Sequence, residues 1–109
     1  MLKPGPAKKL TIYLDEADRV HGKPLYEVLL DIFFKRKMSG ASVFRGIEGY
    51  GHDRVFHTAK ILELSTTLPV RVEVVDTPIK IDEILLEITP IVHKGLITVS
   101  DTQVIKAGS

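Results

Sequence analysis

The segment PVRVEVV, residues 69–75, constrains the fold more than any other stretch of this sequence. Apolar and charged side chains alternate along it, in the order Val70, Arg71, Val72, Glu73 and Val74. This period of two predicts a β-strand with one buried face and one polar face. A second alternating segment, KLTIYL at residues 9–14, predicts another strand of the same kind.

A first amphipathic helix is predicted after Pro24, which suits the first turn of a helix because its missing N–H costs nothing there. Apolar residues recur at three- and four-residue steps, namely Leu25, Val28, Leu29, Ile32, Phe33 and Met38. Ser39 and Gly40 are predicted to end this helix, with Gly40 as the left-handed residue.

A second helix is predicted after Asp76, since Thr77 can cap the free amides and Pro78 fits the first turn. Its apolar stripe consists of Ile81, Ile84, Leu85, Ile88 and Val92. Pro90 removes a donor and crowds the preceding turn, so we expect a kink or break near Thr89.

The remaining strand-like segments complete the order of elements. They are ASVFRGI (41–47), KILELS (60–65) and LITVSDTQVIK (96–106). The order β-α-β-β-α-β, with one extra extended piece, predicts an α+β, ferredoxin-like fold in which two helices cover one face of an antiparallel sheet. We expect a flexible arm over residues 1–7 and a single domain over residues 8–109.

The other face of this sheet would lack helices. Apolar residues are spread over both faces of several predicted strands. We therefore expect a second copy of the chain to bury the uncovered face, so that the protein is an oligomer.

Composition excludes several classes of function. Fifteen Lys and Arg balance fourteen Asp and Glu, giving a net charge of +1, which does not favour a nucleic-acid partner. The absence of cysteine excludes disulfides and Cys-based metal sites. No apolar run approaches the ~18 residues of a membrane span, and the start lacks the apolar segment of a secretory signal. We expect a cytoplasmic protein.

The segment GIEGYG, residues 46–51, places three glycines in six positions before a basic, histidine-rich stretch. Glycine permits left-handed torsions that aim several backbone N–H groups at one phosphate. The segment is neither a Walker A loop nor a dinucleotide fingerprint, because no Lys-Ser/Thr follows it and it opens no helix. A phosphate-binding loop and a glycine bulge at the end of a strand both remain open.

Histidines allow a second interpretation. His52 and His57 are five positions apart, with Asp53 between them as a further donor, so a divalent metal is one alternative. His57 could instead donate to a phosphate oxygen, beside Arg54 and Lys60.

We do not expect an enzyme. No serine, histidine and aspartate stand in an evident triad pattern. Asp15 and Glu16 are adjacent, so their side chains should diverge, and we interpret them as a solvated connection rather than an acid–base pair.

Several stretches together resemble the DUF190 family, which is related in fold to the PII signalling proteins. The resemblance runs from Lys8 to Lys106, and its most specific pieces are RGIEGYG and LSTTLPVRVEVVD. It implies the same ferredoxin-like fold and a homotrimer with subunit sheets packed around a threefold axis. It also implies a protein that senses adenine nucleotides between subunits and reports to a partner, such as a membrane transporter, through a mobile loop.

The resemblance also implies site residues. Gly49, Tyr50 and Gly51 resemble the base of that mobile loop, which would extend from His52 to Thr67. Gly51 would offer an amide to phosphate, with His52 and Asp53 near the ligand. A second group comprises Lys94 and Gly95, in a phosphate-facing turn, and Lys106, among the C-terminal cations. One of these two groups of residues would come from a neighbouring subunit.

The sequence departs from the PII pattern at the turn of Lys94 and Gly95. This turn leads directly into LITV, without the longer glycine-rich loop of PII proteins. The leading hypothesis is a regulatory trimer that binds ATP, ADP, AMP or a similar anion. The alternatives are a CutA-like protein that binds a divalent metal through His52 and His57, and a ligand-free adaptor for a membrane ion channel.

Overall fold

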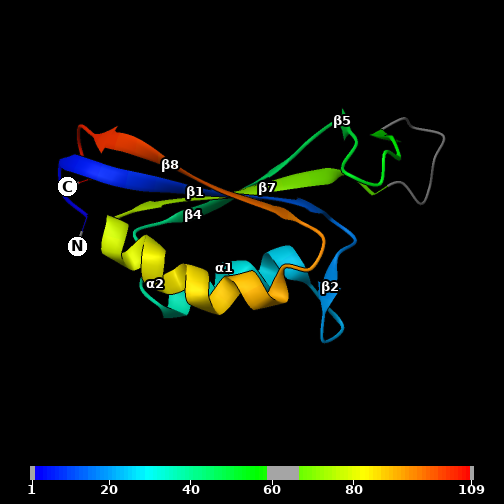
Figure 1. Cartoon of the computed structure of the whole chain (residues 1–109), viewed down its shortest axis with the longest axis horizontal. Coiled ribbons are helices and arrows are strands. Elements are labelled where there is room, and N and C mark those ends of the chain that lie inside the picture. Colours follow the sequence, from blue (N-terminus) through cyan, green and yellow to red (C-terminus); the bar gives the residue numbers. More distant parts are fainter. Residues whose placement is uncertain (1, 59–66, 109) are drawn as a thin grey trace.

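The fold is one antiparallel sheet with helices on one side (Figure 1). The structure, a computed structural model, describes residues 2–58 and 67–108. Within these residues the main sheet has four strands, in the order β4-β7-β1-β8, and two α-helices cover one face. The strands are β1 (Gly5–Asp15), β4 (Ala41–Arg45), β7 (Pro69–Asp76) and β8 (Leu96–Val104); the helices are α1 (Leu25–Lys35) and α2 (Pro78–Ile88). This order confirms the predicted ferredoxin-like fold.

The core forms where the alternating strands face the helices. Val70, Val72 and Val74 are each at most 4% exposed, as the pattern of β7 predicts. Across the β1–β7 ladder they pair with Leu14, Ile12 and Leu10, which are buried on the same face. The helices contribute Leu25, Leu29, Phe33, Ile81, Ile84 and Ile88 to this core.

Helix α1 ends differently from the prediction. The left-handed residue is Lys37, with φ of 58°, and not Gly40. The amides of Lys37 and Met38 donate to the carbonyls of Phe34 and Phe33 at 3.1 and 3.0 Å. This is a Schellman arrangement, which satisfies the last carbonyls of a helix and usually takes glycine at the position of Lys37.

Helix α2 begins and ends as predicted. The amide of Lys80 donates to the Thr77 side chain at 3.3 Å, and Pro78 is the first helical residue. The α-helix stops at Ile88 and continues as the 3-10 turn η1 (Thr89–Ile91), so Pro90 breaks it at the expected place.

The first strand begins earlier than the sequence suggested. Gly5, Pro6 and Ala7, assigned above to a flexible arm, pair with residues 102–104 of β8. Ala7 is 3% exposed. Proline is tolerated there because the ladder with β7 begins only at Lys8, so no β7 acceptor lies opposite Pro6.

Two short hairpins form separate two-stranded sheets. One joins β2 (Arg19–Val20) to β3 (Lys23–Pro24) through His21 and Gly22, whose φ values of 50° and 77° suit a tight turn. The other joins β5 (Glu48–Gly49) to β6 (His57–Thr58). The strand predicted over residues 60–65 lies outside the described residues.

The face of the sheet opposite α1 and α2 carries both apolar and charged side chains. Tyr13 pairs with Arg71 and with Leu96, and Arg71 pairs with Phe44, so these four side chains share that face. The Arg71 guanidinium lies 4.6 Å from the centre of the Phe44 ring. Glu73 lies 2.9 Å from Arg71 Nε. A second copy covering this face would meet aromatic rings and charges together.

Candidate functional site

The glycine segment runs alongside the start of β7. The Gly46 amide donates to the Pro69 carbonyl at 2.7 Å. A Cβ atom on Gly46 or Gly49 would stand 2.9 or 3.1 Å from Cγ of Pro69, so close packing explains both glycines. Among the described glycines only Gly5, Gly22 and Gly108 have positive φ, so Gly46, Gly49 and Gly51 do not form a left-handed phosphate nest.

Local contacts order the loop between β5 and β6. The Arg54 amide donates to the Gly51 carbonyl at 2.9 Å, and Arg54 takes a left-handed φ of 61°. The Asp53 carboxylate accepts from the Val55 amide at 3.1 Å. The rings of Tyr50 and Phe56 lie 4.9 Å apart between centres. Of the two open interpretations, the bend at the end of a strand therefore describes this segment better.

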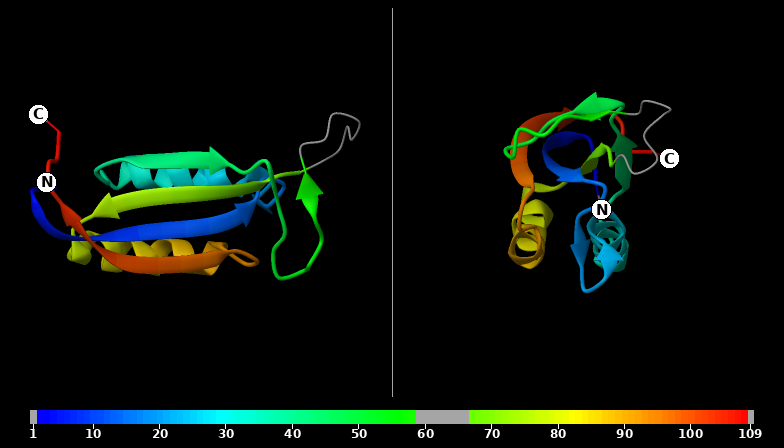
Figure 2. Two further views of the ribbon diagram at one scale, coloured as in Figure 1. Left: turned by 90° about the horizontal axis from the view of Figure 1, so that it is seen from above. Right: turned by 90° about the vertical axis from the view of Figure 1, so that its right-hand side faces the viewer.

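The predicted site residues fall into separate places. Gly49, Gly51, His52, Asp53, Arg54 and His57 all belong to the β5–β6 hairpin. Gly95 packs against the Tyr13 carbonyl and the Leu14 side chain, so it lies near the end of β1. The β5–β6 hairpin lies at the same end of the sheet (Figure 2). Lys94 precedes it. Lys106 follows Val104, which pairs with Gly5, so Lys106 lies at the opposite end of the sheet.

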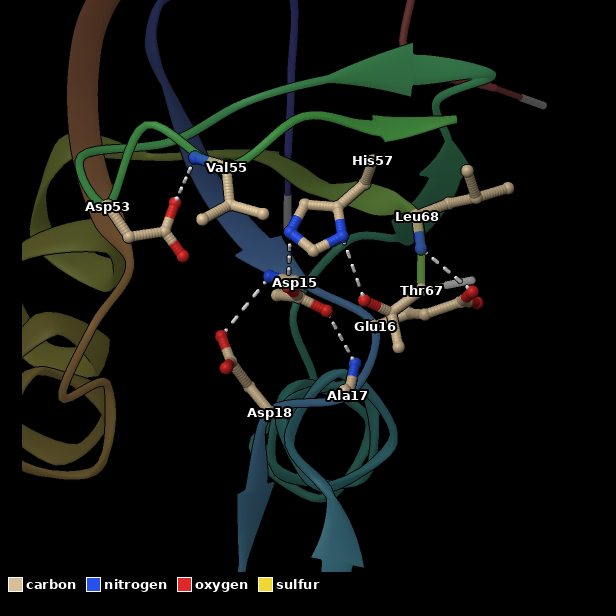
Figure 3. A network of polar contacts seen from close by, with 9 residues as sticks. All are labelled: Asp15, Glu16, Ala17, Asp18, Asp53, Val55, His57, Thr67 and Leu68. Carbon is tan, nitrogen blue, oxygen red and sulfur yellow. Dashed lines mark hydrogen bonds and ion pairs between the residues drawn. The ribbon is translucent and has the colours of Figure 1, made fainter. Parts of the chain in front are cut away.

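His57 connects the hairpin to the main sheet (Figure 3). Its Nε2 atom lies 3.6 Å from Oδ2 of Asp15, and its Nδ1 atom lies 3.3 Å from Oγ1 of Thr67. The side chains of His57 and Asp15 are 24% and 32% exposed. No local sequence pattern predicts this contact, since Asp15 and Thr67 lie in separate polar turns.

Glu16 makes a second connection at the same end of the sheet. Its Oε1 atom accepts from the Leu68 amide at 2.9 Å and from Arg45 at 2.8 Å. The hydrogen bond from Arg45 lowers the pKa of Glu16 below its usual range, opposed by desolvation and aided by the Leu68 amide. These bonds link β4, the end of β1 and the start of β7 directly below the hairpin.

The described part of the chain contains no complete set of ligands for a divalent metal. No group of three or more His, Asp or Glu side chains there is placed to hold a metal ion. His57 contacts Asp15 and Thr67 instead.

Neither helix in residues 2–58 and 67–108 has the length and apolar composition needed to cross a bilayer.

The fold is that of PII-like proteins. The chain matches CPII, a nitrogen regulatory PII-like protein of Thiomonas intermedia K12 bound to ADP, AMP and bicarbonate, with a TM-score of 0.69, 21% identity and coverage of 95% of this chain and 92% of that chain. A structure of the apo form of CPII matches with a TM-score of 0.62, 21% identity and coverage of 94% and 95%. A protein of Thermus thermophilus described as PII-like matches with a TM-score of 0.65, 16% identity and coverage of 95% and 94%.

The chain belongs to the DUF190 family, described as "Uncharacterized ACR", whose model matches residues 7–104. A UPF0166 protein of Aquifex aeolicus is 42% identical over 98 residues, 90% of this chain and 92% of the relative. A UPF0166 protein of Methanocaldococcus jannaschii is 38% identical over 101 residues, 92% of this chain and 93% of the relative.

Proposed function

We propose that this chain is a PII-like regulatory protein of the cytoplasm that binds an adenine nucleotide or a similar anion between subunits of a homotrimer. The bound anion selects one arrangement of the β5–β6 hairpin, and a protein partner, such as a membrane transporter or channel, distinguishes that arrangement. The chain itself carries out no chemistry on the ligand.

The observation that carries the proposal is the distribution of cations over the two ends of the sheet. The hairpin residues His52 and Arg54 project from the same end as Lys94, whereas Lys106 lies at the other end. A site that uses Lys106 with the hairpin therefore requires a neighbouring copy. The CPII structure with ADP and AMP, of the same fold, supports a nucleotide as the guest.

The backbone geometry of the glycine segment limits which groups could bind an anion. Since the Gly46 amide already donates to Pro69, the proposal assigns phosphate to side chains and to the Gly51 amide, not to a glycine nest. Charge-assisted bonds from Arg54 and Lys94 are the expected grip.

Calorimetry with ATP, ADP and AMP on the full chain tests the proposal. We expect binding of at least one nucleotide, with a stoichiometry of one per subunit, and a loss of at least about tenfold in Lys94→Ala and in Lys106→Ala. Lys35→Ala, at the end of α1, is the matched control and should bind normally. Silence for all three nucleotides from an intact oligomer would reject the proposal.

Mixing of variants tests whether two copies share a site. Lys94→Ala and Lys106→Ala chains refolded together should regain about a quarter of the sites, because some interfaces then hold an intact lysine from each copy. No recovery in mixed oligomers would show that both lysines act within one subunit or that neither acts.

A further inference from the structure

The His57 side chain contacts the main sheet from the base of the β5–β6 hairpin. His57 pairs with Gly49 across the hairpin, and its ring reaches Asp15 at the end of β1 and Thr67 just before β7 (Figure 3). The ring therefore contacts two residues of other segments, Asp15 and Thr67. We expect a shift of the hairpin relative to β1 to break this contact.

The carboxylate that faces the ring is held in place by its own turn. Oδ1 of Asp15 accepts from the Ala17 amide at 2.9 Å, and the Asp15 amide donates to Oδ2 of Asp18 at 3.1 Å. A fixed, half-buried acceptor loses less side-chain freedom on pairing than a surface carboxylate does. This Asp15 carboxylate is thus better placed to hold a charged ring than an exposed one.

Both protonation states of the ring fit this geometry, with different strengths. In the neutral ring, Nδ1 accepts from the Thr67 hydroxyl while the Nε2 proton faces Asp15. In the protonated ring, Nδ1 donates to Thr67 Oγ1 and the positive charge stands 3.6 Å from the carboxylate. Only the second state gains charge–charge attraction.

Among residues 2–58 and 67–108, the charged groups in the neighbouring turns have contacts of their own. Glu16 is engaged by Arg45, and the Asp53 carboxylate accepts from Val55 within the loop. The guanidinium of Arg54, in the loop, lies 6.0 Å from the centre of the Tyr50 ring. Asp18 adds negative charge beside Asp15.

We propose that His57 and Asp15 form a proton-dependent latch that holds the β5–β6 hairpin against the end of β1. Protonation of the ring strengthens this contact, and deprotonation weakens it, so the hairpin then moves more readily. This inference rests on the proposed function, to which it adds a regulation of the hairpin by pH. The experiment below uses no nucleotide, so a failure of the latch is distinguishable from a failure of nucleotide binding.

A nitroxide label measures the hairpin directly. The chain contains no cysteine, so Val55→Cys in the exposed loop accepts one label in the otherwise unmodified full chain. The spectrum separates immobile from mobile label, and the ratio of the two reports the latch. Asp15→Asn, His57→Gln and the double variant are compared at pH ~5.5 and ~8.5, on either side of the histidine titration range.

We expect each single substitution to lower the immobile-to-mobile ratio about fivefold at the acid pH and less than about twofold at the alkaline pH. The double variant should lose no more than either single variant, because both remove one contact. His93→Gln, a histidine exposed in the turn before β8, is the control and should change nothing. If Asp15→Asn fails to fold, the pH response of His57→Gln decides alone. A ratio independent of pH in the chain with His57 and Asp15, or additive effects of the two substitutions, would overturn the latch.

Discussion

Oδ2 of Asp76 accepts a hydrogen bond from the amide of Ser39 at 2.8 Å, across 37 positions of sequence. Oδ1 of the same carboxylate accepts from the Thr77 amide at 2.8 Å. Asp76 is the last residue of β7 and is 1% exposed. One buried carboxylate therefore ties the segment after α1 and the start of α2 to the same strand end.

Removing this carboxylate is predicted to destabilise the fold strongly. Asp76→Ala removes the shared acceptor of two part-buried hydrogen bonds, and we expect a loss of about 2–4 kcal/mol in the free energy of unfolding. Urea denaturation at neutral pH measures it. Asp82→Ala, exposed on α2, is the control and should change stability by less than about 0.5 kcal/mol. Equal midpoints for the two variants would contradict the assigned role of Asp76.

The sequence was sufficient for the architecture because the decisive signals are local. The alternation in β7 and the Thr77-Pro78 start of α2 depend on neighbouring residues, and the structure confirms both. The start of β1 was missed because Gly5 and Pro6 are typical of loops. Their strand conformation comes from pairing with β8, roughly a hundred positions away in the chain, which no local pattern reveals.

Gly95 is predicted to be required for packing, whether or not it meets a ligand. A Cβ atom there would stand 2.8 Å from the Tyr13 carbonyl and 2.7 Å from Cδ2 of Leu14. Gly95→Ala should therefore cost about 1–3 kcal/mol of stability, from overpacking at the end of β1. Thermal and urea unfolding check this value. Gly40→Ala, where a Cβ meets nothing within 4 Å, should be nearly neutral; the same loss at both positions would refute the packing argument.

Lys37 offers a stabilising substitution. Its left-handed φ of 58° strains a residue with a Cβ atom. The hydrogen bond from its backbone N–H to the Phe34 carbonyl uses only main-chain atoms, so glycine can make it too. Lys37→Gly should raise the free energy of unfolding by about 0.5–1 kcal/mol. Lys35→Gly, still inside α1, should lower it by a similar amount. If both glycines destabilise, the Schellman end of α1 does not control its stability.

The candidate site was less predictable than the fold, since its contacts join distant turns. The cluster of His52, Asp53, Arg54 and His57 in one hairpin follows from their nearness in sequence. The partners of His57 do not: Asp15 and Thr67 meet it only because β1 and β7 pair antiparallel. Asp15 and Glu16, interpreted above as a solvated connection, instead hold that end of the sheet together through His57, Arg45 and the Leu68 amide.

The bond between Arg45 and Glu16 predicts a pH dependence of stability. Because Arg45 lowers the pKa of folded Glu16 below its ordinary value of 4.5, the pair stabilises the fold above that pH and loses its effect as the pH falls through the folded-state pKa. Arg45→Gln should thus be less stable than the unmodified chain at about pH 7, and the difference should shrink as the pH is lowered from 4.5 toward about pH 3. Urea denaturation across this range measures the difference. Glu16→Gln serves as control: in that background Arg45→Gln should give a difference with much weaker dependence on pH. If the stability difference between the unmodified chain and Arg45→Gln stays the same in acid, the effect of Arg45 comes from its packing and not from its charge.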